Sequence, residues 1–239
     1  MLINAKDYKD FKELNKAIKT SSGKNVEVIN LLGERFIGDG LKDKYIKISS
    51  GIPGNALGAY LDGAKIEVLG NAQDATGDTM NEGEIIIHGS SGDTCGYAMR
   101  GGEIYVRGNT GYRSGIHMKA YETKNPVMVI GNKAGSFLAE YMAGGTIIVL
   151  GLDNPNNLVG DFSFTGMYGG KVIVRGNVNV DKTRLNIEPI TEEILDEIKP
   201  YLNKFAKYFD VSIKEILKEE FNVITPNTNN PFKTLYVAN

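Results

Sequence analysis

Three side chains in this sequence have the reactivity that an enzyme or a metal site would use: one cysteine and two histidines. Cys95 could act as a thiolate nucleophile only beside a base that lowers its pKa. Six places after the preceding glycine, it aligns with Thr76 and Ser114, which predicts a structural position for small residues. His88 and His117 stand in separate segments, with no carboxylates spaced to complete a metal-ligand set. We therefore expect no catalytic residue, no cofactor-binding residue and no metal ligand in this chain.

Glycine-rich segments raise the question of phosphate binding. A P-loop would need a glycine five places before Gly170-Lys171 and a hydroxyl residue after it, where the chain has Thr165 and Val172. The acidic residues near predicted turns are scattered, and we expect them to bond turns and ladders rather than to form a catalytic pair: Asp74, Asp78, Asp93 and Asp161. The sequence predicts no nucleotide site.

Composition excludes several other classes of protein. The 27 basic and 29 acidic residues give a net charge of −2, which argues against a basic surface for nucleic acid. A lone cysteine excludes a disulfide framework and any iron–sulfur cluster or metal site built on several local thiolates. No apolar run approaches the ~20 residues of a membrane span, and the segment after Met1 does not resemble a signal peptide. We expect a cytoplasmic protein that binds neither nucleic acid nor a membrane.

Glycine is the compositional outlier: 29 of the 239 residues are glycine, and 25 of them lie between Gly51 and Gly176. In that stretch, short β-branched runs end on glycines spaced 19, 19, 19, 23, 20 and 25 residues apart. Apolar residues at the first and third positions of each run indicate strands. A strand recurring about every 20 residues is typical of a solenoid. The sequence therefore predicts an all-β solenoid, a parallel β-helix, with strands beginning at Ile66, Ile85, Ile104, Val127, Ile147 and Val172.

Stacking these repeats predicts two columns of side chains. Five of the seven methionines occupy equivalent positions, which indicates an inward ladder of core residues: Met80, Met99, Met118, Met142 and Met167. The middle residue of each strand faces outward, and a row of apolar side chains there needs a cover. Either the C-terminal helices or another subunit must supply it. These residues are therefore the candidate partner-docking site: Ile86, Tyr105, Met128, Ile148 and Ile173.

The flanks of the repeat are expected to be helical. Residues 5–20 have the spacing of an amphipathic helix, and apolar residues recur at helical spacing over 191–209, where Pro200 should end or kink the helix. Ser212 to Glu215 form a capping box that opens a second short helix. The predicted organisation is an N-terminal helix and lead-in strand over residues 1–44, the β-helix over 45–176, and a C-terminal helical extension and tail over 177–239.

Several long motifs resemble one family. The sequence is similar to the GXGXG domain, the C-terminal part of the large (α) subunit of glutamate synthase, in GNAQDATGDTM (70–80), GDTCGYAMRGG (92–102), GYRSGIHMK (111–119) and AGSFLAEYMAGG (134–145). Residues 34–41 and 231–236 continue the resemblance, which thus covers nearly the whole chain. It looks most like the archaeal form, in which this domain is a separate polypeptide.

The resemblance implies a single-stranded right-handed parallel β-helix that carries no known catalytic residue. In that family an amidotransferase unit with an N-terminal nucleophilic cysteine hydrolyses glutamine. A synthase unit that contains FMN and an iron–sulfur cluster reduces the imine formed from 2-oxoglutarate and ammonia. This chain would be a non-catalytic scaffold that holds these two partners, with FMN and the cluster on the partner and no cofactor bound here.

Other interpretations stay open. Formylmethanofuran dehydrogenase has a subunit that shares the GXGXG fold, and a solenoid with its own carbohydrate-active site is an alternative from a different class. Self-association of the chain is also compatible with the sequence.

Overall fold

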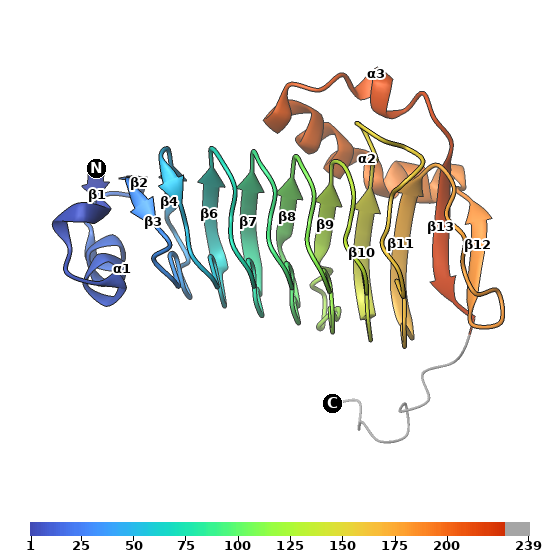
Figure 1. The fold of residues 1–239 in the computed structure, drawn as a ribbon, viewed down its shortest axis with the longest axis horizontal. Coiled ribbons are helices and arrows are strands. Elements are labelled where there is room, and N and C mark those ends of the chain that lie inside the picture. Colours follow the sequence, from blue (N-terminus) through green and yellow to red (C-terminus); the bar gives the residue numbers. More distant parts are fainter. Residues whose placement is uncertain (228–239) are drawn as a thin grey trace.

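The computed structural model describes residues 1–227, and one sheet of eleven strands dominates it. Nine of these strands pair in parallel, one after another: β1 (Leu2–Asn4), β2 (Asn25–Ile29), β4 (Tyr45–Ile48), β6 (Asp62–Val68), β7 (Glu82–Ile87), β8 (Glu103–Val106), β9 (Val127–Ile130), β10 (Ala143–Val149) and β11 (Gly169–Arg175). Figure 1 shows them in a row along the long axis of the molecule. The predicted β-helix with flanking helices is confirmed.

The inner face of this main sheet supplies the core. Ile85 pairs with Ile104 and Ile87 with Val106, and the same two inward columns run through the neighbouring coils. The methionine ladder predicted from the sequence is buried at all five positions. Stacked side chains of similar size give every coil a similar cross-section, as a solenoid requires.

The wall opposite the main sheet is built from residues in the left-handed backbone region, and we call it the αL wall (36–40, 56–60, 75–79, 94–98, 113–117, 137–141 and 162–166). Every second residue there has positive φ, as at Ala75, Gly77 and Thr79. The N–H groups of these positive-φ residues point in turn to the following and the preceding coil. The N–H of Ala75 donates forward to Asp93, and that of Gly77 donates back to Leu57, both at 2.8 Å. A Cβ on Gly77 would lie 2.4 Å from Cδ1 of Ile104, so glycine lets this wall approach the sheet.

One strand has a different register from the one predicted. Met128 pairs with Ile104 and Ile147 and points into the core, whereas Val129 pairs with Tyr105 on the outer face. The prediction placed Met128 outward, and that is wrong. In this coil the closing Gly131 comes one residue early, in the column of Arg107 rather than after it. All four residues of β9 are apolar and buried. The strand therefore has no alternation of polar and apolar residues from which the shift in register could be predicted.

The two ends of the solenoid are closed differently. At the N-terminal end a 3-10 turn (Ala5–Asp7) leads to α1 (Phe11–Thr20), which Asp10 caps and which buries Leu14 and Ile18 against the core. The solenoid already includes β1 and β2, which lie within residues 1–44. A small second sheet pairs β3 (Leu31–Leu32) with β5 (Gly51–Ile52). At the other end β13 (Phe221–Pro226) pairs antiparallel with both β11 and β12 (Leu185–Pro189). The tail motif at 231–236 lies outside the described residues.

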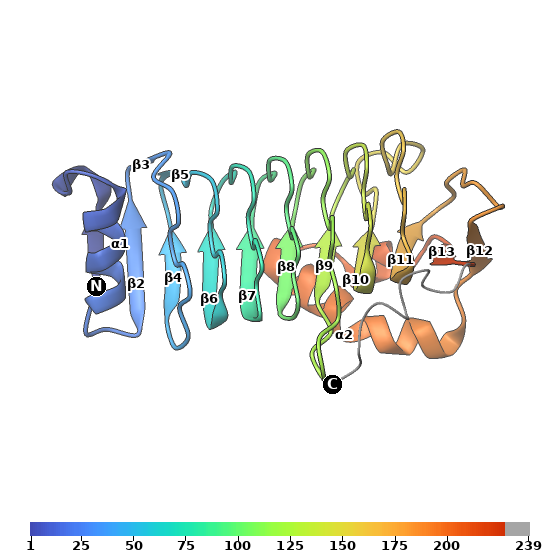
Figure 2. The ribbon, with the colours of Figure 1, turned by 90° about the horizontal axis from the view of Figure 1, so that it is seen from below.

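Two helices lie outside the main sheet. Helix α2 (Glu192–Phe209) begins at the N-cap Thr191 and continues through Pro200. Of the two predicted effects of this proline, an end or a kink, the helix does not end there. The short α3 (Ile213–Ile216) begins at Ser212, whose hydroxyl accepts the N–H of Glu215 as the capping box predicts. Figure 2 shows α2 alongside the C-terminal strands. Among the described residues no helix is both long and apolar enough to cross a bilayer.

The cover formed by α2 makes Tyr105 a stability residue. Tyr105 is fully buried, and its ring meets that of Tyr208 edge-on at 5.3 Å. Tyr105→Asp should lower the free energy of unfolding by about 3 kcal/mol or more, because it places a carboxylate where an apolar ring packs. Thermal and urea denaturation measure the change. Tyr60→Asp, at an exposed ring, should leave stability nearly unchanged, and equal stability of the two variants would contradict the burial.

Candidate docking surfaces and the polar network beside them

The predicted docking column is covered by the chain itself. All five residues named for it are buried: Ile86, Tyr105, Met128, Ile148 and Ile173. Four of them pack with the apolar face of α2, and Met128 lies in the inner core instead. The helix contributes Ile198, Leu202 and Phe205 to this contact. The column is therefore an internal interface rather than a free surface. The sequence left open whether the C-terminal helices or another subunit covers this column, and in the structure helix α2 covers it.

Gly131 directly follows β9 and lies close to both the preceding coil and α2. A Cβ there would lie 2.1 Å from the carbonyl oxygen of Arg107 and 2.9 Å from Cζ of Phe205. The backbone of the preceding coil therefore leaves no room for a side chain at this position.

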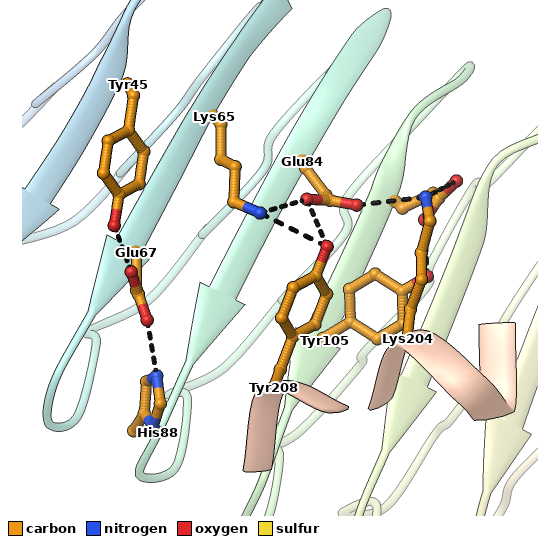
Figure 3. Close-up of polar contacts among 9 residues, drawn as sticks. Tyr45, Lys65, Glu67, Glu84, His88, Tyr105, Lys204 and Tyr208 are labelled. Atoms are coloured by element: carbon orange, nitrogen blue, oxygen red, sulfur yellow. Dashed lines mark hydrogen bonds and ion pairs between the residues drawn. The ribbon is translucent and has the colours of Figure 1, made fainter. Parts of the chain in front are cut away.

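A polar network anchors the C-terminal half of α2 to the sheet (Figure 3). The Glu84 carboxylate accepts hydrogen bonds from Lys65 at 2.8 Å, Tyr208 at 2.7 Å and Lys204 at 3.1 Å. Lys204 also binds Glu103 at 2.7 Å. Lys65 lies over the Tyr208 ring, 4.5 Å from its centroid, a cation–π contact. Two helix residues, Lys204 and Tyr208, are thus tied to three charged residues of the sheet.

The network sets the charge states of its members. Burial alone would raise the pKa of the Glu84 carboxyl, but the hydrogen bonds from Lys65, Tyr208 and Lys204 outweigh it and hold that pKa below its ordinary value. Burial and the hydrogen bond to Glu84 raise the pKa of the Tyr208 hydroxyl. The carboxylate is ionised and fully engaged, so it serves as an anchor rather than as a general base.

A second row of hydrogen-bonded side chains lies beside the Glu84 network, on the part of the outer sheet face that α2 does not cover. Glu67 accepts a hydrogen bond from Tyr45 and contacts Nε2 of His88 at 2.9 Å (Figure 3). The His88 ring meets Phe209, the last residue of α2, edge-on at 5.2 Å. Both oxygens of Glu67 are engaged, and burial together with Glu67 raises the pKa of the Tyr45 hydroxyl. His88 therefore packs beside the end of the helix.

Cys95 and the acidic residues near the turns have structural rather than catalytic contacts. Cys95 is fully buried in the same column as Thr76 and Ser114, as predicted, and burial raises the pKa of its thiol to about 11. Oδ1 of Asp74 accepts the N–H of Asp93 at 2.9 Å. Asp74 and Asp93 thus form hydrogen bonds from coil to coil, as expected. Within residues 1–227 no group of three or more His, Cys, Asp and Glu side chains could hold a metal ion.

Two short rows of aromatic side chains that sequence reasoning missed lie on the αL wall or directly beside it. We call them together the aromatic ladder: Tyr112, Phe137 and Phe162 in one row, and Tyr97, His117 and Tyr141 in the other. Phe137 lies between Tyr112 and Phe162, with centroids 5.1 and 5.2 Å away. His117 stacks on Tyr141 at 5.5 Å and meets Tyr97 edge-on at 6.0 Å. The signal was available, because aromatic residues recur at equivalent wall positions in successive repeats.

Arg113 joins the ladder to a buried acid. Its guanidinium lies 4.7 Å from the Tyr112 centroid and 5.3 Å from that of Phe137. Its Nε donates to Glu140 at 2.7 Å, and the Glu140 side chain is only 7% exposed. The cation is thus held on two rings and neutralised by its own carboxylate.

A cavity of about 720 Å³ lies where the αL wall ends. The last coil contributes Leu158, Phe162 and Phe164 to its lining, and the segment that crosses this end contributes Val178 and Arg184.

The geometry first defines a class: a parallel β-solenoid with one face sealed by its own helix and an aromatic ladder on the opposite wall. A family profile described as the GXGXG motif matches residues 9–229. The chain therefore belongs to the GXGXG motif family, the family of the glutamate synthase C-terminal domain. It is 46% identical to the uncharacterized protein MJ1350 of Methanocaldococcus jannaschii over 251 aligned residues, which cover 99% of this chain and 96% of that protein.

The Glu84 anchor predicts a pH dependence. The folded pKa lies below the ordinary 4.5, so the unfolded state binds more protons as the pH falls below that value. The stability from ionised Glu84 is present above about pH 4.5 and is lost as the pH falls through the lower folded pKa. Glu84→Gln should destabilise the chain by about 1–3 kcal/mol at pH 7 and flatten the acid loss of stability. Urea denaturation from pH 7 to pH 3, with exposed Glu188→Gln as the control, tests this; an unchanged acid profile would contradict it.

The core columns predict unequal costs for two buried sulfur residues. Cys95→Ser should cost less than about 1 kcal/mol, because Ser114 already occupies the equivalent place in the next coil. Met99→Ala should cost about 2–5 kcal/mol, because it leaves a cavity in the methionine ladder. Chemical denaturation of both variants measures the difference. A severe loss in Cys95→Ser alone would show that the thiol has a role beyond packing.

Proposed function

We propose that this chain is a non-catalytic scaffolding subunit of glutamate synthase. It would hold an amidotransferase unit and an FMN- and iron–sulfur-containing synthase unit together. Ammonia released from glutamine would then pass to 2-oxoglutarate without escaping to solvent. The observation that carries the proposal is the family match over residues 9–229, which includes every parallel strand except β1.

The state of the reactive side chains supports a scaffold. Amidotransferase chemistry of this family needs a nucleophilic cysteine at the N-terminus, whereas Cys95 is internal, buried and has a raised pKa. Glu67 and Glu84 each use both oxygens in structural contacts. These groups build the solenoid and attach its helix. On this proposal FMN and the iron–sulfur cluster belong to the synthase partner.

Purification of the complex tests the proposal. The affinity-tagged full-length chain, expressed in its host, should co-purify with an amidotransferase and a flavin synthase polypeptide. The isolated chain should be colourless and should release no ammonia from glutamine, and addition of the chain should raise glutamate formation by the two partners. The destabilised variant Tyr105→Asp serves as the matched negative control.

Two results would contradict this function. Co-purification with the molybdenum or tungsten polypeptides of formylmethanofuran dehydrogenase would assign the chain to that complex instead. FMN bound to the isolated chain, or glutamine turnover by it, would end the scaffold interpretation.

A further inference from the structure

We propose that residues 232–237 of this chain form one more segment of the αL wall, stacked on the last coil. In that place they close the C-terminal end of the solenoid and occupy the cavity of about 720 Å³ that lies there. The occupant of the cavity is thus a segment of the same chain, FKTLYV, which follows the described residues. This role does not depend on the function proposed above.

The last coil has an open edge on the αL wall. In the coil before it, the N–H groups of Phe137 and Tyr141 donate forward to carbonyl oxygens of the last coil, both at 2.9 Å. The equivalent donors of the last coil itself are the N–H groups of Phe162 and Gly166. Within residues 1–227 neither has an acceptor, and both residues line the cavity. An edge of unpaired backbone groups is a template for one more extended segment.

The segment 232–237 repeats the sequence pattern of the wall. Residues 137–142, one wall segment and the residue after it, read FLAEYM, and 232–237 read FKTLYV. The two share phenylalanine at the first place, tyrosine at the fifth and an apolar residue at the sixth. The sixth place is apolar in every coil, because its side chain points into the core as part of the column that contains the methionine ladder.

The left-handed backbone of the wall accepts these residue types. Phe137 has φ of 61° and Tyr141 of 53°, so aromatic residues already adopt this conformation at the first and fifth places. The central place is glycine in most coils, but Phe164 occupies it in the last coil with φ of 69°. Thr79 shows that the wall also holds a threonine at positive φ, 51°. Thr234 at the central place is therefore compatible with the same backbone path.

The register pairs the open donors. By analogy with the coil before, the carbonyl of Pro231 would accept the N–H of Phe162, and the carbonyl of Leu235 would accept that of Gly166. Pro231 then stands at the place that Asp161 has in the last coil. The N–H of Asp161 has no acceptor within residues 1–227. A proline, which lacks an N–H, therefore loses no hydrogen bond at this place.

Two columns of side chains end abruptly at the last coil, and the segment would continue both. The Phe162 ring stacks on Phe137 at 5.2 Å but is 69% exposed. Phe232 at the same place in the next coil would lie over that ring. Met167 is the last residue of the methionine ladder, and Val237 would follow it in the inward column. Each contact removes apolar surface from water.

The polar part of the cavity lining also suits this segment. Its charged residues are Asp161, Asp181 and Arg184, two acids and one base, which leave one net negative charge. Lys233 is the one charged side chain in residues 228–239. It occupies the second place of the wall pattern, where side chains point inward, as the buried Cys95 does. Beyond the last coil this direction leads into the cavity, so the lysine would meet an acidic lining.

The last described residue lies beside the cavity. The N–H of Asn227 donates to the carbonyl of Arg184 at 3.0 Å, and Arg184 lines the cavity. Five residues lead from Asn227 to Phe232, and they span up to about 17 Å when extended. A second copy of the chain cannot supply its first coil instead, because α1 closes that end with Leu14 and Ile18.

A disulfide pair tests the stacking. We would introduce Thr165→Cys and Leu235→Cys, at fourth places of neighbouring coils, into the full-length chain with Cys95→Ser. Equivalent Cα atoms of adjacent coils are about 4.8 Å apart, which a disulfide can bridge. Asp39→Cys with Leu235→Cys is the matched control, because the exposed Asp39 has the fourth place in the first wall segment. Mild oxidation followed by peptide mass spectrometry measures the yield within one chain and between chains.

We expect an intramolecular disulfide in most molecules of the Thr165 pair and in few molecules of the control. Equal yields in the two pairs would overturn the stacking. A Thr165 pair that is linked between two chains instead would overturn the assignment to the same chain and would show that copies exchange this segment.

Thermal melting gives a second, independent measurement. Phe232→Ala/Tyr236→Ala in the otherwise unaltered chain should lower the melting temperature by about 4 °C or more, because the last coil loses its cover. Asn230→Ala lies before the segment and should leave the melting temperature unchanged. A double variant that melts like the unaltered chain would contradict the closing role of this segment.

Discussion

The alternation of left-handed and right-handed residues in the αL wall is the constraint on which the rest of the molecule depends. It directs the N–H groups of its left-handed residues in turn to the coil after and the coil before, as the bonds of Ala75 and Gly77 show. Each coil is therefore hydrogen-bonded to two neighbours on this wall as well as through the main sheet. Where the wall lies on the inward isoleucines its central residue is small, as at Gly77 and Gly115. The glycines at the centre of the wall and the isoleucine columns of the core thus belong to the same geometry.

The outer face of the sheet is shared between two environments. From β7 to β11 it is apolar and covered by α2, whereas around β4 and β6 it carries the polar chain of Tyr45 and Glu67. The network of Glu84, Lys204 and Tyr208 lies where the two environments meet. The helix therefore ends where the sheet ceases to be apolar. On the αL wall opposite, rings such as Tyr141 and Phe162 stay exposed.

Repetition made much of this structure predictable. A column such as Thr76, Cys95 and Ser114 follows from counting, because each coil repeats the same backbone path. Counting failed at β9, because this coil closes on Gly131 one place early and Met128 therefore points into the core. The sequence did not decide whether the C-terminal helices or another subunit covers the outer column. An amphipathic pattern indicates that a helix has an apolar face, but not which surface that face packs against. The ladder was missed because four of its six rings occupy positive-φ positions, which sequence patterns assign to glycine: His117, Phe137, Tyr141 and Phe162.

The two anchors of α2 relate the length of the helix to the number of coils beneath it. The helix is bound through Glu197 to Lys171 on β11 and through Tyr208 to Glu84 on β7. Eleven residues separate these two anchors on the helix, about 16 Å at 1.5 Å per residue. The corresponding columns are four strand steps apart, about 19 Å at some 4.8 Å per step. A solenoid otherwise tolerates the gain or loss of whole repeats, but beneath this helix the number of coils is set by a fixed length. A coil gained or lost between β7 and β11 would therefore separate one of these two anchors from its partner.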